Sequence, residues 1–201
     1  MINNIEIIKP LLNFDKKGDF YMLYVFKRKK DQPEGERDNH QSVRTIKTYC
    51  IDSLEYLDKR YDEVKMLCEV FKARAYIHVQ KQNHFDVSLE MMIELACRIK
   101  NNVHNQKHIF DTVVGQLKTN EKRWIVDIDS KLPQYVMQVE GFINTLRPIG
   151  KKVEAIIPTK NGFHLITSKF DVMEFEKHYP DLDIQKKNPT LLYYPNSLNN
   201  E

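Results

Sequence analysis

The sequence has only three cysteines, Cys50, Cys68 and Cys97, and none of them belongs to a CxxC pair. Their odd number leaves at least one unpaired, which argues against a disulfide scaffold and a cysteine-rich zinc site and fits a reducing compartment. Apolar runs are also short. None approaches the ~20 residues that span a bilayer, and no charged-then-apolar signal segment opens the chain. We therefore expect an intracellular, cytoplasmic protein with no membrane partner.

Excess charge of either sign is small as well. Thirty-one Lys and Arg residues against 28 Asp and Glu residues leave a formal net charge of +3, too little for a protein that coats nucleic acid by bulk attraction. The 201 residues are 41% hydrophobic and 29% charged, which supplies a core and excludes a wholly disordered chain. We expect one domain, on which any nucleic-acid surface must be local.

Strand-like and helix-like segments alternate along the chain. Residues 20–27 form a continuous aromatic and β-branched run, residues 43–51 are the expected returning strand of a hairpin, and a helical repeat follows from Leu54 behind a cap at Asp52 or Ser53. The later strands are expected at 74–80, 122–129, 152–158, 163–168 and 190–194, and the later helices after Asp86 or Ser88, from Pro133, and at 171–178. This alternation predicts strands layered with helices, in an α/β or α+β fold.

The first candidate site is a pair of aspartates at the end of the strand at 122–129. Asp127 and Asp129 are separated by one residue, and residues i and i+2 of a strand project from the same face. Two carboxylates held this close repel each other and favour a bound cation, and hard cations such as Mg²⁺ take such oxygen ligands together with substrate phosphates. Capping of the next helix is the alternative role of so short a motif.

The second candidate is the turn that joins the strands at 152–158 and 163–168. It contains Thr159, Lys160, Asn161 and Gly162, and Asn-Gly favours a hairpin because both residues tolerate positive φ. His164 follows in an apolar strand. Lys160 and the amides of the turn are candidates for attracting phosphate, although a solvated turn lysine has the same appearance in a sequence.

A third carboxylate follows the last predicted helix. Asp183 stands between Leu182 and Ile184, and Asp181 is the competing candidate. Tyr193 and Tyr194, in the last apolar run, are either core residues or platforms on which bases stack. A basic run near the N-terminus is either a solvated strand end or a nucleic-acid contact: Lys27, Arg28, Lys29 and Lys30.

Taken in order, these segments resemble the catalytic core of the archaeo-eukaryotic primase (primase–polymerase) superfamily, in particular its small mobile-element members. WIVDID matches the family's D-x-D strand, Gly162–Phe163–His164 its small-x-His motif, and Leu182–Asp183 its third acid. The segment LLYYPNSLN stands where many relatives have LLRxPGSxN, with Tyr193 in place of arginine and Asn196 in place of glycine. The resemblance covers about residues 74–199.

The resemblance implies a fold and an activity. The fold would be α+β, with an RRM-like, primase-type mixed β-sheet packed with helices over residues 72–201 and an N-terminal ββα portion over residues 1–71. The activity would be that of a DNA primase or polymerase: Asp127, Asp129 and Asp183 would hold two Mg²⁺ or Mn²⁺ ions, and His164, with Thr159 and Lys160, would contact a nucleoside triphosphate. A single-stranded DNA or RNA template, a helicase or other replication protein as partner, and a phage or plasmid setting are further implications.

Two other classes of function compete with this prediction. A non-catalytic module with an RRM-like sheet would bind single strands through Tyr76, Tyr194 and the basic run, but it has no use for three converging acids. A replication-initiator nuclease needs two histidines on one strand, separated by one hydrophobic residue, and this chain offers only lone histidines such as His78 and His164.

Overall fold

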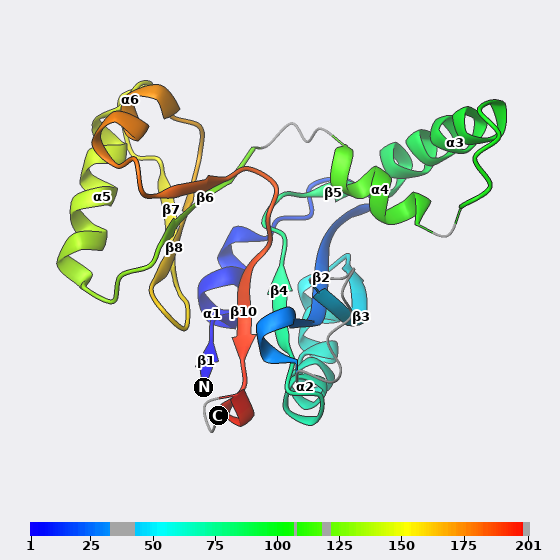
Figure 1. Cartoon of the computed structure of the whole chain (residues 1–201), viewed down its shortest axis with the longest axis horizontal. Coiled ribbons are helices and arrows are strands. Elements are labelled where there is room, and N and C mark those ends of the chain that lie inside the picture. The colour runs from blue at the N-terminus through cyan, green and yellow to red at the C-terminus, as the bar shows by residue number, and fades with distance from the viewer. Residues whose placement is uncertain (33–42, 107, 118–121, 199–201) are drawn as a thin grey trace.

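The computed structural model describes residues 1–32, 43–106, 108–117 and 122–198 (Figure 1). It confirms an α+β fold, in which helices α1–α6 accompany two antiparallel sheets. The sheets lie beside each other in Figure 1. The second sheet with α5 and α6 is on the left, the first sheet is in the centre, and α3 and α4 project on the right.

The first sheet has the strand order β1-β10-β4-β2-β3, and β5 pairs with the start of β2. Its strands are β1 (Ile2–Asn3), β2 (Asp19–Arg28), β3 (Val43–Ile51), β4 (Arg74–Ile77), β5 (Gln82–Asn83) and β10 (Thr190–Tyr194). The expected hairpin is confirmed, because β2 pairs antiparallel with β3 from Tyr21↔Ile51 to Arg28↔Val43. Helix α2 (Leu54–Val70) packs on this sheet through buried side chains such as Leu57 and Val64.

The second sheet has the order β7-β8-β6-β9. Along the chain its elements are β6 (Trp124–Ile128), α5 (Pro133–Thr145), β7 (Val153–Pro158), β8 (Phe163–Thr167), α6 (Val172–His178) and β9 (Asp183–Gln185). This β-α-β-β-α-β succession is the split βαβ arrangement of ferredoxin-like and RRM-like sheets. Both helices cover one face, where Val126, Val139, Leu165 and Phe175 form a common core.

One sheet of mixed strand direction was expected, and this part of the prediction is wrong. Every strand pair of the described residues is antiparallel, and the strands divide between two sheets. The last strand explains the division. After β9 pairs with β6 in the second sheet, the chain crosses over, and β10 pairs between β1 and β4 in the first.

The two sheets share a hydrophobic core. Ile125, Ile157 and Ile166, on the face of the second sheet that lies opposite its helices, belong to the same buried cluster as the core of the first sheet. Helix α1 (Ile5–Ile8) lies between the sheets (Figure 1), and the side-chain amide of Asn4 donates to the carbonyl oxygens of Pro158 and Leu191, each at 2.9 Å. The strands of residues 1–71 pair directly with β4 and β10, so this segment and the rest of the chain form one body.

Side-chain caps set the starts of α2 and α3, and one predicted cap is wrong. Ser53 caps α2 by accepting a hydrogen bond from the Tyr56 amide, as expected. Helix α3 (His84–Lys100), however, begins ahead of Asp86 and Ser88, because the side chain of Asn83 accepts from the Phe85 amide and caps the helix earlier. Helix α4 (Ile109–Gln116) was not expected, since its apolar repeat is only two turns long. No helix of the described ranges is both long and apolar enough to cross a bilayer.

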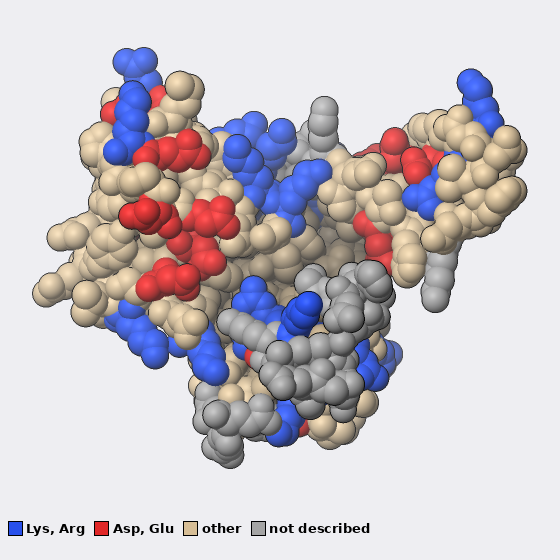
Figure 2. All heavy atoms as spheres, viewed as in Figure 1, with Lys and Arg blue, Asp and Glu red and all other residues tan. Residues whose placement is uncertain are grey.

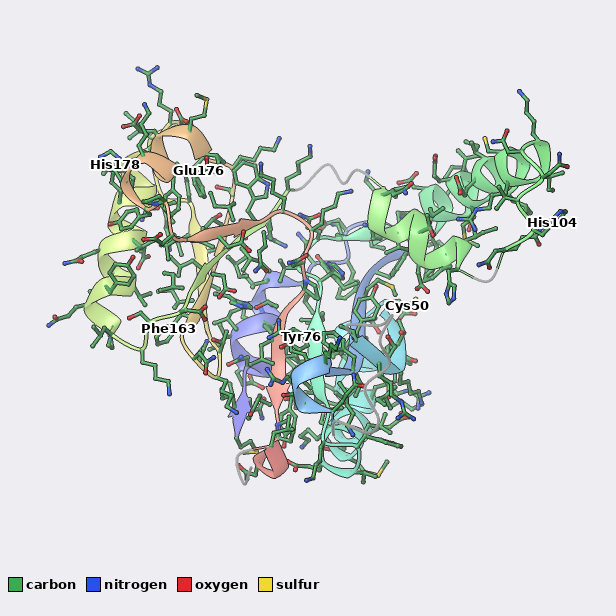
Figure 3. All side chains as sticks on the ribbon, in the orientation of Figure 1. Cys50, Tyr76, His104, Phe163, Glu176 and His178 are labelled. Carbon is green, nitrogen blue, oxygen red and sulfur yellow. The ribbon has the colours of Figure 1, made fainter. Side chains whose placement is uncertain are left out.

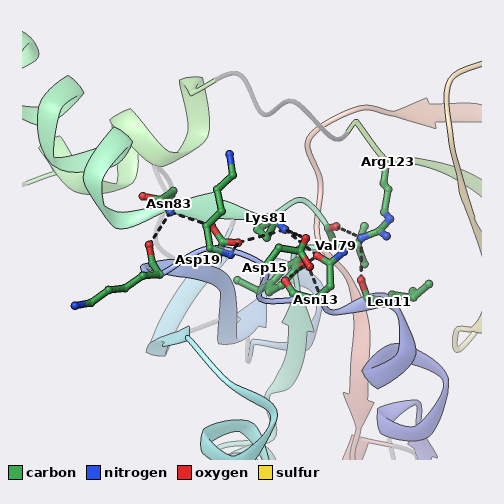
Figure 4. Close-up of polar contacts among 11 residues, drawn as sticks. Leu11, Asn13, Asp15, Asp19, Val79, Lys81, Asn83 and Arg123 are labelled. Atoms are coloured by element: carbon green, nitrogen blue, oxygen red, sulfur yellow. Dashed lines mark hydrogen bonds and ion pairs between the residues drawn. The ribbon is translucent and has the colours of Figure 1, made fainter.

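A polar network ties the start of the chain to the segment that enters the second sheet (Figure 4). The Lys81 ammonium lies 2.8 Å from Asp15 Oδ2 and 3.3 Å from Asp19 Oδ2, and Asn83 donates to the other oxygen of Asp19 at 2.9 Å. Arg123, just before β6, donates to the carbonyl oxygens of Leu11 at 2.8 Å and Val79 at 3.2 Å. A single guanidinium therefore connects three segments.

Arg123→Ala should lower the free energy of unfolding by about 1–3 kcal/mol, because two carbonyl oxygens at the junction lose a charged donor. Arg123 also pairs with the more exposed Glu154 at 2.7 Å, and Glu154→Ala, the matched control, should cost only about 0–1 kcal/mol. Urea denaturation of both variants measures the difference. Equal losses would show that the surface ion pair, not the carbonyl contacts, holds the junction.

Candidate active site

The centre of the candidate site is a row of three residues across the second sheet. Asp127 of β6 is directly opposite His164 of β8 on one side and directly opposite Asp183 of β9 on the other. Residues directly opposite each other in antiparallel strands project from the same face. The strand register therefore places two acids and the histidine, which are far apart in the sequence, next to one another.

Gln185 joins the two carboxylates of this row. Its side-chain amide donates to Asp183 Oδ2 at 2.9 Å and to Asp127 Oδ2 at 3.3 Å. The sequence interpretation missed this residue. The available signal was its position two residues after Asp183 on one strand, which gives it the same face of the sheet.

Asp129 follows β6 by one residue and adds a third negative charge. Burial, then the charges of Asp129 and Asp183, raise the pKa of the Asp127 carboxyl above its ordinary value, and the positive charge of Arg28 opposes this rise only in part. Folding therefore disfavours the ionised form of Asp127. A nearby cation would stabilise the ionised form of such a carboxylate.

His164 is buried beside this cluster. Its Nε2 atom lies 3.5 Å from Asp127 Oδ1, and its Nδ1 atom lies 2.9 Å from the hydroxyl oxygen of Thr190. Burial first, and the positive charge of Arg28 second, lower the pKa of His164 to about 4. The imidazole is therefore neutral at pH 7, and in the tautomer whose Nδ1 accepts from the Thr190 hydroxyl it presents an N–H from Nε2 toward the cluster.

Gly162 brings the β7–β8 turn against the aspartate segment. A Cβ atom at this position would lie 1.8 Å from the carbonyl oxygen of Ile128 and 2.8 Å from the amide nitrogen of Ser130. The Asn-Gly hairpin is present, but its expected cause is wrong: positive φ among the described residues occurs at Gly18, Lys72, Asn102 and Gly150. Glycine is needed at position 162 because the backbone that carries Asp129 passes directly over it.

A cleft of about 380 Å³ opens over this row of residues, between the two sheets. The first sheet contributes Phe26, Arg28, Arg74 and Tyr76, and the second sheet with its turn contributes Asp127, Asp129, Thr159, Lys160, His164 and Gln185. Tyr76 lies in the first sheet, at the centre of Figure 3, while Phe163 lies in the second sheet, on the left. In Figure 2 acidic side chains gather over the second sheet, and lysine and arginine side chains gather beside it, between the second sheet and the α3–α4 arm.

The floor of the cleft is aromatic. Phe26 and Tyr76 stack with their ring centroids 4.7 Å apart, and the guanidinium of Arg28 lies 5.9 Å from the Tyr76 ring. The cations of Arg74 and Lys160 lie 4.9 Å and 5.3 Å from the ring of Tyr194. These contacts hold positive side chains over rings at the edge of the site.

Several candidate residues lie elsewhere. Tyr193 and Tyr194 are buried, so neither ring is available as a stacking platform, and the hydroxyl of Tyr193 donates to Glu69 at 2.9 Å. Of the basic run, Arg28 lines the cleft, Lys27 is half-buried and Lys29 is exposed, while the side chain of Lys30 lies outside the described residues.

The choice of third acid depends on strand pairing. Asp181 lies in the turn before β9 and has no partner strand, whereas Asp183 is paired with Asp127 in the sheet. Although Asp183 belongs to the row, it is not among the residues that line the cleft itself.

The fit of these residues to a metal ion rests on their chemistry. Within residues 1–32, 43–106, 108–117 and 122–198, no three His, Cys, Asp or Glu side chains form a group close enough to hold a metal ion. Yet the side-chain amide of Gln185 donates to the carboxylates of both Asp127 and Asp183, and the charges of Asp129 and Asp183 both raise the pKa of Asp127. Oxygen donors with unbalanced negative charge fit Mg²⁺ or Mn²⁺, provided that the Gln185 amide turns aside.

Comparison with known proteins identifies no relative. No protein-family model matches the chain, and neither a curated protein nor a solved structure does.

Gly162→Ala should destabilise the protein by at least ~2 kcal/mol, because the new methyl group must displace backbone rather than a flexible side chain. Gly141→Ala is the matched control. Position 141 lies within α5 with nothing within 4 Å of its Cβ site, so alanine there should stabilise the helix by about 0.5–1 kcal/mol. Chemical denaturation would contradict the close-approach argument if the two variants had the same stability.

Asp127→Asn should raise the melting temperature at pH 7 in EDTA, by about 2–4 °C for each kcal/mol of relieved repulsion. The sign follows from the raised pKa: the folded state holds the carboxylate at a cost above that pKa, and the cost disappears as the pH falls through it. The gain should therefore shrink toward acid pH. Asp181→Asn, outside the row, should have no such effect, and a lower melting temperature for Asp127→Asn would contradict this electrostatic account.

Proposed function

We propose that this chain is a template-dependent nucleotidyltransferase of the primase–polymerase type. The observation that carries the proposal is the register of β6, which sets Asp127 directly opposite both Asp183 and His164 at the wall of a cleft. The order of motifs along the sequence supports the same function, because the residues that resemble the primase motifs are the ones that meet there.

Asp127, Asp129 and Asp183 are the residues that would hold Mg²⁺ or Mn²⁺. When bound, such ions help a hydroxyl to attack and stabilise the leaving pyrophosphate. The side chain of Gln185 holds Asp127 and Asp183 together by donating to both. It therefore keeps two like charges oriented toward one point before the cation arrives.

Basic groups from both sheets would orient the nucleoside triphosphate. Arg28 and Arg74 face the cleft from the first sheet, and Lys160 faces it from the β7–β8 turn. The exposed Arg28 is free to meet phosphate, whereas Arg74 is already paired with Asp31 at 2.6 Å. His164 would donate from Nε2 to a phosphate oxygen in the tautomer whose Nδ1 accepts from the Thr190 hydroxyl.

The structure weakens the competing proposal of a non-catalytic single-strand-binding module. That function depended on the exposed rings of Tyr76 and Tyr194, but both are buried, and Tyr76 is stacked on Phe26. Three acids beside the cleft would also repel a nucleic-acid backbone when no cation is present. The proposed activity requires a single-stranded DNA or RNA template, and a helicase or other replication protein would be a partner where a duplex has to be unwound.

The double variant Asp127→Ala plus Asp129→Ala should reduce nucleotide incorporation into a primed single-stranded template, with Mn²⁺ present, by at least about 100-fold. The same variant should lose the increase in melting temperature that Mn²⁺ gives the parent, a measurement that does not depend on activity. Asp181→Ala is the matched control, because Asp181 is a neighbouring acid outside the strand pairing.

Full incorporation by the double variant would overturn the proposed catalytic role. Single-strand binding that EDTA leaves unchanged, in a chain that incorporates no nucleotide with either Mg²⁺ or Mn²⁺, would instead establish the non-catalytic module.

A further inference from the structure

Helix α3 carries an exposed apolar stripe that the fold of one chain does not cover. One face of the helix packs toward α4 through Val87, Met91 and Leu95. On a second face, Phe85 is 73% exposed, Leu89 50%, Met92 69% and Ile99 61%. A continuous apolar surface of this kind on a soluble protein marks a site of interaction with another surface.

The spacing of the stripe specifies what it fits. Its apolar positions are 85, 89, 92, 96 and 99, separated alternately by four and three residues. This 3.5-residue average is the heptad pattern of a helix that pairs lengthwise with one other helix, and it is narrower than the stripe by which a helix packs on a globular core. Over 17 residues the helix is about 25 Å long.

The placement of the helix leaves room for such pairing. Helices α3 and α4 form an arm that projects from the body (Figure 1), and His104 lies at its far end, while Tyr76, which lines the cleft, lies in the first sheet at the centre (Figure 3). The stripe is therefore remote from the candidate active site. Its role is independent of the proposed activity.

Charge along α3 indicates the direction of pairing. Asp86, Glu90 and Glu94 lie in the first three turns, and Arg98 and Lys100 lie in the last. Glu94 and Arg98 already pair with each other at 2.7 Å. Asp86 and Lys100 flank the stripe on one side, two heptads apart, and neither forms an ion pair within the described part of the chain. An antiparallel second copy would bring these unlike charges together, whereas in a parallel pair each flank lies beside the opposite flank of the partner, and neither charge meets the other.

We propose that the chain forms a two-fold symmetric dimer in which α3 pairs antiparallel with α3 of a second copy. In the register that complements both charge and size, Leu89 lies opposite the partner subunit's Ile99, and Met92 lies opposite the partner subunit's Ala96. Asp86 then lies beside Lys100 of the partner subunit, and Ile93 lies next to the two-fold axis. Each contact occurs twice because the interface is isologous.

Sedimentation velocity over a range of concentrations tests the dimer. The parent chain should shift from the monomer to twice its mass, and Leu89→Ser plus Met92→Ser should raise the dissociation constant at least about tenfold. Met66→Ser plus Val70→Ser is the matched control, because these side chains are 56% and 69% exposed on α2. A parent that stays monomeric, or a dimer that the α3 variant leaves intact, overturns the proposal.

A charge exchange tests the direction. Asp86→Lys and Lys100→Asp should each weaken the dimer by about two- to fivefold, and the double variant should restore it, because the unlike charges then meet again. In a parallel pair the double variant would show no such rescue. All effects should diminish in high salt, since these charges are exposed.

A cross-link tests the register. In a Cys97→Ser background, Ile93→Cys should form a disulfide between two copies under mild oxidation, because the residue lies beside the axis. Glu90→Cys, on another face of α3, should not. Efficient cross-linking at position 90 and not at position 93 would overturn the proposed register.

Discussion

The pairing register of β6 is the constraint on which the candidate site depends. This short strand is hydrogen-bonded on both sides, so one residue, Asp127, has two direct neighbours, His164 and Asp183. A shift by one residue would turn Asp127 toward α5 and α6 and bring Val126 or Ile128 into the cleft. The register is held by burial, because Val126 and Ile128 lie in the core beneath the helices. Hydrophobic packing on one face thus sets the polar chemistry on the other.

The same grouping of acids lowers the stability of the fold. Asp127 is partly buried next to two other acids, and its pKa is raised as a result. A fold selected for stability alone would not gather these charges on a sheet. Gln185 partly offsets the repulsion by donating to two carboxylates at once, and His164 avoids adding to the burial cost by remaining neutral. Clusters with perturbed pKa values of this kind are typical of functional sites.

The architecture separates three tasks in space. The second sheet supplies acids and histidine, the first sheet supplies Arg28 and Arg74 across the cleft, and the α3–α4 arm projects away from both. The junction at Arg123 and the shared core around Ile125 keep the two sheets together, so that residues more than 100 positions apart face one cleft. The arm packs on β2 through Phe20 and Met22, but it contributes no residue to the lining of the cleft, so its apolar stripe is not part of the site.

Local patterns in the sequence determined much of this protein. The strands at 20–27 and 43–51, the Ser53 cap and the placement of Asp127 and Asp129 on one face all follow from interactions between near neighbours. Only the tertiary structure decided which later acid pairs with Asp127, that Tyr193 and Tyr194 are buried, and that Gln185 and Arg28 belong to the site. Gly162 shows the reason most clearly. Its sequence context indicated a turn, but the need for glycine comes from Ile128, more than thirty residues away, whose carbonyl oxygen leaves no space for a side chain. Such contacts depend on how distant strands pack, which no local pattern encodes.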